Sequence, residues 1–288
     1  MTLPRRHTSL SEIRDAVATA RGQGQRIALV PTMGALHEGH LSLVRKAQDN
    51  ADHVIVSIFV NPTQFAPTED FASYPRDAEA DIRALAGLGV ESVFLPVQEE
   101  MYPAGFATGI TIGGPATGLE SDSRPHFFNG VALVVTKLLL ACQPDIAVFG
   151  EKDYQQLCVI RQLVRDLNIP VTILAAPTVR EADGLAMSSR NRYLDEDARR
   201  RAALLPEVLR DTLQALSECA GADRQEEALL RKSIARLTEG GFRVEYLSLR
   251  DAETLAPPTD DSRRLRLLVA AWLEKTRLID NMAFERPD

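Results

Sequence analysis

The stretch that decides the fold runs from Ile27 to His40 and reads IALVPTMGALHEGH. Its first residues are apolar and β-branched, as in a strand that is covered on both faces. Glycines interrupt this pattern at Gly34 and Gly39, and helical spacing begins at His40. A strand, a glycine-containing turn and a helix start form an anion site, since free backbone N–H groups and the positive end of the helix dipole point at one place. We therefore predict a phosphate-binding loop within residues 31–40.

His37 and His40 stand three residues apart in the first turn of the predicted helix. Both can present ring N–H groups to phosphate oxygens and stabilise charge that develops during transfer. Two alternatives stay open, namely plain helix capping and a metal site. The metal is disfavoured, because the spacing is H-E-G-H instead of H-E-x-x-H and no third ligand is evident nearby. The P-loop and dinucleotide fingerprints are both missing.

Apolar runs alternate with amphipathic stretches through the first two-thirds of the chain. The runs predict strands at 26–32, 54–60, 92–95, 146–149 and 171–174, with helices at 40–51, 78–88, 131–141 and 154–167. Repeated β-α units predict an α/β fold with a doubly wound, Rossmann-like parallel sheet, whose ligand lies beyond the carboxyl ends of the strands. We assign this Rossmann-like, ligand-binding domain to residues 1–178.

The pattern changes after Val179. Charged, Leu- and Ala-rich helices are predicted at 195–219 and 223–239, and strands at 243–249, 265–273 and 276–282. Residues 179–288 are therefore expected to form a smaller α+β domain that acts as a lid.

Charge and cysteine usage exclude several classes of protein. The 288 residues carry a net charge of -7, whereas a general nucleic-acid binder is normally basic. Cys142, Cys158 and Cys219 are widely spaced, which fits a reducing cytosol better than a disulfide framework. No signal peptide or membrane span is expected, because no apolar run is long enough. We predict a cytoplasmic protein without membrane or nucleic-acid partners.

Three further segments carry chemistry, and two of them directly follow a predicted strand. In the segment 149–156, Gly150 permits close approach of a flat ligand, Lys152 supplies charge and Asp153 can accept from ribose hydroxyls. The segment 186–192 places Ser188, Ser189 and Arg190 together, a set that suits several phosphate oxygens. Each segment has a plain alternative, a solvated helix turn for the first and a linker for the second.

The other strand-end segment is 59–65, which reads FVNPTQF. Asn61 and Gln64 place two amides in an apolar frame, where they could hydrogen-bond a small polar molecule without adding charge. A proline turn capped by asparagine is an equally good interpretation on local grounds.

Together, PTMGALHEGH, FVNPTQF, GEKDYQQL and MSSRN make the chain resemble the pantoate–β-alanine ligase family along essentially its whole length. That family shares an H-x-G-H nucleotide-binding motif with class I aminoacyl-tRNA synthetases. The resemblance implies His40 as the catalytic histidine, with His37, Lys152 and Arg190 also acting in catalysis. It implies that ATP is held by Met33, Gly34, Ala35, Leu36, His37, Glu38, Gly39, His40, Gly150, Glu151, Lys152, Asp153, backbone at Val179, Met187, Ser188, Ser189 and Arg190.

The same resemblance implies the substrates and the reaction. Gln64 and Gln156 would hold pantoate, and Asn61 with Gln64 would lie near β-alanine. Pantoate would be activated by ATP and Mg²⁺ to pantoyl-adenylate with loss of pyrophosphate, after which β-alanine would displace AMP. The family also suggests a homodimer, while the metal ligands stay unknown. An adenylyltransferase that stops after transfer and a non-catalytic nucleotide-binding regulator are the competing hypotheses.

Two positions depart from the family pattern. Phe127 replaces the usual histidine of R-P-x-H-F-x-G, and His126 stands one residue early. Glu274 stands where glycine is usual, a change expected to affect a C-terminal turn and not the chemistry.

Overall fold

The computed structural model describes residues 2–65, 71, 74–218 and 223–286. By internal packing the chain forms two compact units. The first takes in residues up to 151 and 159–177, and the second takes in residues 152–158 and those from 178 onward. In the described ranges no helix combines the length and the apolar character that crossing a bilayer requires.

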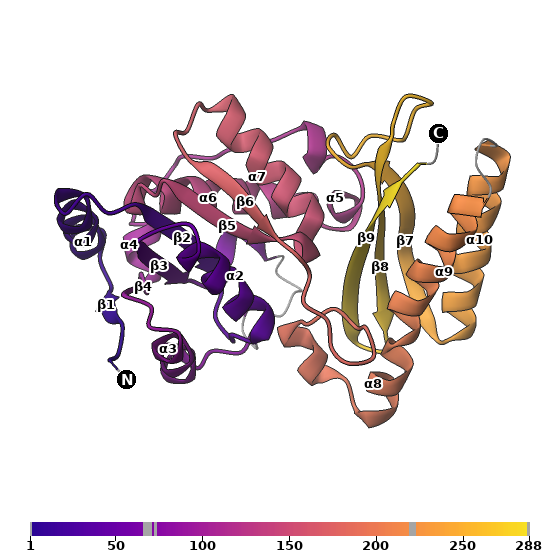
Figure 1. Ribbon diagram of the computed structural model, residues 1–288, viewed down its shortest axis with the longest axis horizontal. Coiled ribbons are helices and arrows are strands. Elements are labelled where there is room, and N and C mark those ends of the chain that lie inside the picture. The colour runs from indigo at the N-terminus through magenta and orange to yellow at the C-terminus, as the bar shows by residue number, and fades with distance from the viewer. Residues whose placement is uncertain (1, 66–70, 72–73, 219–222, 287–288) are drawn as a thin grey trace. The chain divides into compact units, whose positions relative to one another are not determined.

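The first unit contains a six-stranded sheet in which all strands are parallel (Figure 1). Its order is β1-β4-β3-β2-β5-β6, with bounds Arg5–His7 (β1), Ile27–Thr32 (β2), His53–Ile58 (β3), Ser92–Phe94 (β4), Ile146–Gly150 (β5) and Thr172–Ala176 (β6). The predicted doubly wound sheet is confirmed. Strand β1 was not predicted, because two arginines and a histidine give no apolar signal and only pairing with β4 makes them a strand.

Helices cover both faces of this sheet. They are α1 (Leu10–Gly22), α2 (Glu38–Gln48), α3 (Ala78–Gly87), α4 (Gln98–Met101), α5 (Glu120–Ser123), α6 (Phe127–Cys142) and α7 (Tyr154–Asp166). Val44 of α2 and Leu85 of α3 share a buried cluster with Val30 and Val56 of the sheet. Alternate strand residues such as Leu29 and Ile55 are fully buried and point to the opposite face, where α1 and α6 pack.

Helix α1 was missed although the sequence carries a signal for it. Ser9 and Glu12 form a capping box, in which the Ser9 hydroxyl accepts from the Glu12 N–H at 3.2 Å. The polar residues around this box hide the apolar stripe of Ile13, Val17 and Ala20, which is buried.

Strand β2 lies between β3 and β5. Strands β3 and β4 are added on one side of β2, and β5 and β6 on the other, so the switch point of the sheet lies between β2 and β5. The chain continues from β2 to β3 on one side and from β5 to β6 on the other, and in sheets of this kind ligands bind at the loops that follow the two strands beside the switch point. Those loops are the predicted phosphate segment after Thr32 and the residues after Phe149.

The second unit contains an antiparallel sheet of β7 (Phe242–Asp251), β8 (Arg264–Leu273) and β9 (Thr276–Glu285). Helices α9 (Leu204–Glu218) and α10 (Asp223–Glu239) lie side by side against it (Figure 1), and a short α8 (Glu196–Ala202) precedes them. Leu205 and Leu209 of α9 pack in one core with Leu267 and Val269 of β8. The predicted smaller α+β domain is confirmed as a fold.

One predicted helix of this unit is wrong in detail. The stretch 195–219 is two helices, which meet at Ala203. Pro206 lacks an N–H and is tolerated only in the first turn of a helix, so a new helix begins just before it. Cys219 lies outside the described residues, while Cys142 and Cys158 are buried thiols, and burial raises the pKa of the Cys142 thiol to about 12.

The departure at Glu274 falls in the turn between β8 and β9. Glu274 has a φ of 55°, in the left-handed region that favours glycine, and its carboxylate pairs with Arg201. The expectation that this change affects a turn is confirmed.

Two histidines of the first unit share one serine hydroxyl. His7 Nε2 and His53 Nε2 lie 3.2 Å and 3.0 Å from Ser92 Oγ. Burial lowers the pKa of both imidazoles, because desolvation disfavours the charged form. Their folded pKa therefore lies below the unfolded value of about 6.5, and the stability they contribute is present above that value and lost as the pH falls through the folded pKa.

We expect the melting temperature to fall on acidification from about pH 8 to about pH 5. Carboxylates also titrate below this range, so the measurement compares wild type with a His7→Gln/His53→Gln variant, whose amides cannot titrate. The stability difference between the two proteins should change with pH. A constant difference would contradict the role assigned to these histidines.

Candidate active site

The predicted phosphate loop follows β2, and the carboxylate of Asp81 on α3 binds its backbone. Asp81, only 4% exposed, accepts the N–H groups of Ala35 at 3.0 Å and of Leu36 at 2.7 Å. Gly34 donates its N–H to Thr32 Oγ1 at 3.2 Å. The expectation of free N–H groups in this loop is therefore wrong for these residues, because the protein itself uses them to fix the loop.

Glycine is required at position 34 for two reasons. Gly34 has a φ of 84°, and a Cβ added there would lie 2.8 Å from Asp81 Oδ2. The backbone at position 34 thus lies so close to the Asp81 carboxylate that only glycine fits there.

His37 and His40 contact each other at the start of α2, with ring centroids 4.1 Å apart. His37 is the N-cap, and its Nδ1 accepts the Gly39 N–H at 3.1 Å. His40 Nδ1 accepts the N–H of His37 at 3.3 Å. A neutral imidazole that accepts at Nδ1 carries its proton on Nε2, so both rings are N–H donors at Nε2.

The interpretation of His37 as a helix cap is therefore confirmed. Because the capping hydrogen bond is accepted at Nδ1, it leaves Nε2 as the donor, so capping and phosphate binding are compatible. Glu38, in the same turn, pairs its carboxylate with Arg45 of α2, which lowers the Glu38 pKa. In the described part of the chain no cluster of three histidine, cysteine or acidic side chains has the geometry of a metal site.

In the FVNPTQF segment Gln64 ends η1 (Pro62–Gln64), Asn61 is its N-cap, and both side chains are buried. Asn61 donates to Gln64 Oε1 and to the Gly130 carbonyl, both at 3.2 Å. Its own oxygen accepts the hydroxyl of Tyr102 at 2.8 Å and the N–H of Thr63 at 3.4 Å. Asn61 therefore caps the turn, which confirms the interpretation of this residue as a capping asparagine.

Gln64 connects this turn to the phosphate loop. Its Nε2 lies 2.8 Å from the sulfur of Met33, the first residue of the loop. Two predicted site segments that follow different strands, β2 and β3, are therefore brought together in the first unit.

The departure at Phe127 lies beside the same turn. The Arg124 guanidinium stacks on the Phe127 ring at 3.8 Å and donates to the Gln64 carbonyl at 3.3 Å. Phenylalanine here supplies a face for the arginine. His126 stands at the N-cap position of α6, where its side chain makes no capping hydrogen bond and its Nε2 is buried without a partner in the described residues.

Gly150 ends β5, where it pairs with Ala176 of β6, and Glu151 begins the short 3-10 helix η3 (Glu151–Asp153). The remaining predicted residues belong to the second unit. Lys152 forms an ion pair with Asp153 at 3.9 Å, and Gln156 lies in the first turn of α7.

The segment with Met187, Ser188, Ser189 and Arg190 pairs with the backbone of residues 179 and 180. The Val179 carbonyl accepts the Met187 N–H at 3.0 Å, so two predicted ATP contacts are adjacent in one short hairpin. Ser188 Oγ accepts the Arg190 N–H at 3.3 Å and caps η4 (Ser189–Tyr193).

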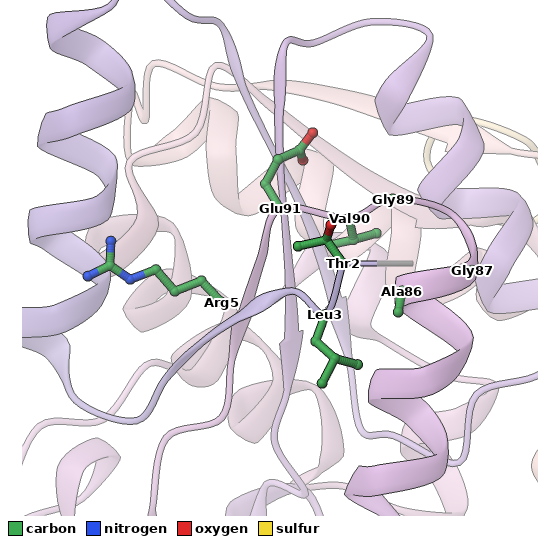
Figure 2. A pocket seen from close by; sticks show the side chains of 8 residues that line it. All are labelled: Thr2, Leu3, Arg5, Ala86, Gly87, Gly89, Val90 and Glu91. Carbon is green, nitrogen blue, oxygen red and sulfur yellow. The ribbon is translucent and has the colours of Figure 1, made fainter.

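A surface hollow of about 650 Å³ lies elsewhere on the first unit (Figure 2). It is lined at the amino ends of β1 and β4 by residues that include Arg5, Val90 and Glu91. Ligands of open α/β sheets bind at the carboxyl ends of strands, so this hollow is not the candidate active site.

Three side chains that shape the site were not predicted, namely Asp81, Tyr102 and Arg124. Asp81 had a signal in the sequence, because it falls on the buried face of α3 beside Ile82 and Leu85. An acid on an apolar helix face requires a buried partner. Nothing local points to Arg124 as a site residue, because its hydrogen bond to the Gln64 carbonyl joins residues that lie far apart in the chain.

Replacing Asp81 with asparagine should loosen the phosphate loop. The amide offers one acceptor oxygen to two N–H groups and turns its own N–H₂ toward the second, so we expect a loss of about 1–3 kcal/mol of unfolding free energy and a higher KM for ATP. Urea denaturation and steady-state kinetics measure both.

Asp77→Asn is the matched control on the same helix. Asp77 caps α3 by accepting the Ala80 N–H at 2.9 Å, and asparagine caps about as well as aspartate. Equal effects of the two substitutions would contradict the role given to Asp81.

A doubly wound sheet with a pair of Nε2-donating histidines beside its switch point defines a nucleotide-binding α/β protein of the H-x-G-H type. The family model described as pantoate-beta-alanine ligase matches residues 5–283. The chain belongs to the pantoate–β-alanine ligase family.

Similar proteins support this family membership over nearly the full length of the chain. The pantothenate synthetase of Mesorhizobium japonicum is 53% identical over 98% of both chains, and that of a Bradyrhizobium strain is 54% identical over 97% of this chain and 98% of its own. The solved structure of the Thermus thermophilus enzyme aligns with a TM-score of 0.89 at 44% identity, covering 96% of this chain and 98% of its own. The Francisella tularensis ligase, solved with beta-gamma ATP and beta-alanine, aligns with a TM-score of 0.80 at 36% identity over 97% of both chains.

The protein is thus an ATP-dependent ligase that forms the C–N bond between pantoate and β-alanine.

Proposed function

We propose that the activated intermediate is pantoyl-adenylate and that the Met33–His40 loop binds the phosphates of ATP. The observation that supports the loop's part is the pair of Nδ1 contacts, which makes His37 and His40 donors at Nε2. Such donors stabilise the negative charge that builds up on the phosphates during transfer.

We further propose the predicted roles for the cationic residues. Lys152 and Arg190, with Mg²⁺ that enters on the triphosphate as part of the substrate, offset the repulsion between the pantoate carboxylate and ATP. The carboxylate attacks the α-phosphorus and pyrophosphate leaves. The amine of β-alanine then attacks the acyl carbon, and AMP leaves.

The experiment separates the two half-reactions. Protein, ATP, Mg²⁺ and pantoate should release pyrophosphate, and later addition of β-alanine should release AMP and form pantothenate. Release of ADP and phosphate would contradict the adenylate route. An adenylylated product that survives the amine would favour an adenylyltransferase, and a His40→Ala variant with unchanged rate would favour a regulator without catalysis.

Gln64 and Gln156 are proposed to hold pantoate, and Asn61 with Gln64 to lie near β-alanine. Gln64→Ala should raise the KM for both organic substrates by roughly 10-fold, the scale for a lost hydrogen bond to a charged group, while ATP binding is retained. Kinetics in each substrate and nucleotide titration by calorimetry measure this. Gln162→Ala, on the exposed side of α7, is the control, and an equal loss of ATP binding in Gln64→Ala would indicate misfolding instead.

The homodimer, the cytoplasmic location and the lid role of residues 179–288 stay predictions. Sedimentation equilibrium of the purified chain tests the first of them.

A further inference from the structure

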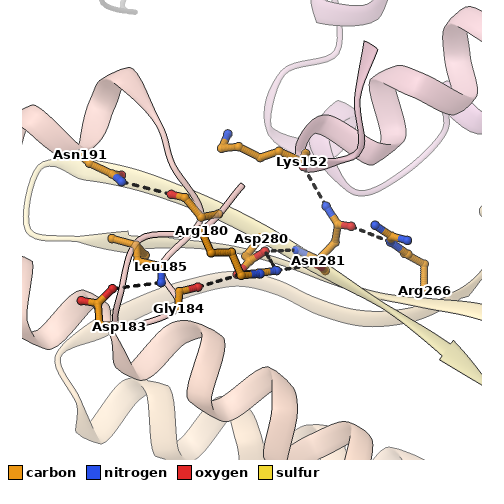
Figure 3. A network of polar contacts seen from close by, with 10 residues as sticks. Lys152, Arg180, Asp183, Gly184, Leu185, Asn191, Arg266, Asp280 and Asn281 are labelled. Atoms are coloured by element: carbon orange, nitrogen blue, oxygen red, sulfur yellow. Dashed lines mark hydrogen bonds and ion pairs between the residues drawn. The ribbon is translucent and has the colours of Figure 1, made fainter. Parts of the chain in front are cut away.

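Asn281 on β9 binds two groups of the second unit at once. Its Nδ2 donates to the Lys152 carbonyl at 2.8 Å, and its Oδ1 accepts Arg266 Nε at 2.6 Å (Figure 3). A carbonyl only accepts and a guanidinium only donates, so the orientation of this amide is fixed by its partners. Asn281 is 3% exposed and Arg266 7%, and Arg266 also stacks on Tyr154, two residues after Lys152.

The preceding residue of β9, Asp280, holds a different segment. Its side chain is fully buried and accepts both terminal nitrogens of Arg180, at 2.7 Å and 2.9 Å. Arg180 also donates to the Asn281 carbonyl at 3.3 Å, and Asp280 Oδ1 accepts the Asn281 N–H at 2.7 Å. A buried bidentate pair of this kind is directional and strongly coupled.

Arg180 begins the hairpin that leads to Arg190. It pairs with Ala186 across the hairpin and donates to the Gly184 carbonyl at 2.9 Å. Asn191, next to Arg190, closes the far side by donating to the Ala186 carbonyl at 3.1 Å. A shift of Arg180 would therefore move the backbone that carries the Ser188–Arg190 segment.

We propose that Asp280 and Asn281 are positioning residues that fix Lys152 and the Arg190 segment to one strand, and so set the spacing of two cations that act on the same phosphates. Neither residue touches substrate in this proposal, which rests on the proposed roles of Lys152 and Arg190. Strand β9 lies in a ten-residue antiparallel pairing with β8, so it supplies a rigid support.

The test of the first arm is a double-mutant cycle between Asn281→Asp and Lys152→Ala. Aspartate keeps an acceptor for Arg266, but it removes the donor to the Lys152 carbonyl and places a second carboxylate oxygen against that carbonyl. We expect pantoate-dependent pyrophosphate release to fall by about 10-fold or more, the scale of a small misplacement, with the KM for β-alanine little changed. With Lys152 already alanine, Asn281→Asp should have no further effect.

Asn50→Asp is the matched control, since Asn50 also donates to a lysine carbonyl at 2.8 Å, that of Lys46, on an exposed helix end. It should leave the rate unchanged. If Asn281→Asp fails to fold, the smaller polar variant Asn281→Ser goes through the same cycle.

The outcomes separate the two claims. Additive losses, or an Asn281→Asp variant at the wild-type rate beside an impaired Lys152→Ala, would overturn the positioning role alone. A Lys152→Ala variant at the wild-type rate would overturn the role of Lys152, and the positioning role with it. The second arm is tested in the same way with Asp280→Asn and Arg190→Ala, where additive losses would overturn the anchoring of the Arg190 segment.

Discussion

Lys152→Ala is expected to slow pantoate-dependent release of pyrophosphate by roughly 10²-fold or more, the scale for losing one preorganised charge partner. The pantoate carboxylate and the triphosphate repel each other, and the charge on the departing pyrophosphate grows as the bond breaks. Lys152 is only 20% exposed and its backbone is held by Asn281, so its charge is both partly desolvated and positioned. A stopped-flow pyrophosphate assay under single-turnover conditions measures the step directly.

Lys232→Ala is the control for this experiment, because Lys232 is an exposed lysine of α10. It should leave the rate unchanged. Lys152→Arg should recover part of the lost rate, since it restores the charge but not the point geometry of an ammonium. Pyrophosphate release at the wild-type rate in Lys152→Ala would remove this residue from the proposed site.

Gly130→Ala is expected to disrupt the turn that carries Gln64. A Cβ at position 130 would lie 2.4 Å from the Thr63 carbonyl oxygen and 2.9 Å from the Gln64 nitrogen. Both groups are backbone, so no side chain can swing away and either α6 or η1 must shift. Overpacking of this kind costs about 1–3 kcal/mol of unfolding free energy. A shift of this turn should also raise the KM for pantoate and β-alanine by roughly 10-fold or more.

Denaturation and steady-state kinetics measure both effects. Gly22→Ala is the control, because Gly22 also lies in a helix, as the last residue of α1, but has nothing within 4 Å of its added Cβ. That variant should be neutral or slightly more stable, as alanine has the higher helix propensity. A Gly130→Ala protein with wild-type stability and wild-type KM values would show that α6 does not pack on η1 in solution.

The strands that were predicted correctly share one property. Ile27–Thr32, His53–Ile58 and Ile146–Gly150 are buried runs of apolar residues, and this pattern is visible without knowing their neighbours. Strand β1 has no such pattern and exists because Arg5 and His7 pair with β4. The break at Ala203 was missed because helical spacing continues across it, and only the proline chemistry marks the boundary.

The candidate site shows the same division. His37, His40, Asn61 and Gln64 were predicted as site residues because turn residues directly follow apolar runs, and the carboxyl ends of parallel strands share one edge of the sheet. What the sequence did not reveal is how the protein uses these groups internally. The N–H groups of the phosphate loop are taken by Asp81, and the Asn61 amide by Gly130 and Tyr102.

Local sequence therefore determined the α/β class, the family and the segments proposed to bear the chemistry, because periodicity and turn residues act over a few neighbouring positions. Tertiary structure alone decided which nitrogen of each histidine carries the proton, which carboxylate supports the loop, and which strand anchors Lys152 and Arg180. Those outcomes depend on groups that are distant in the chain and meet only after packing, when each buried donor must find an acceptor.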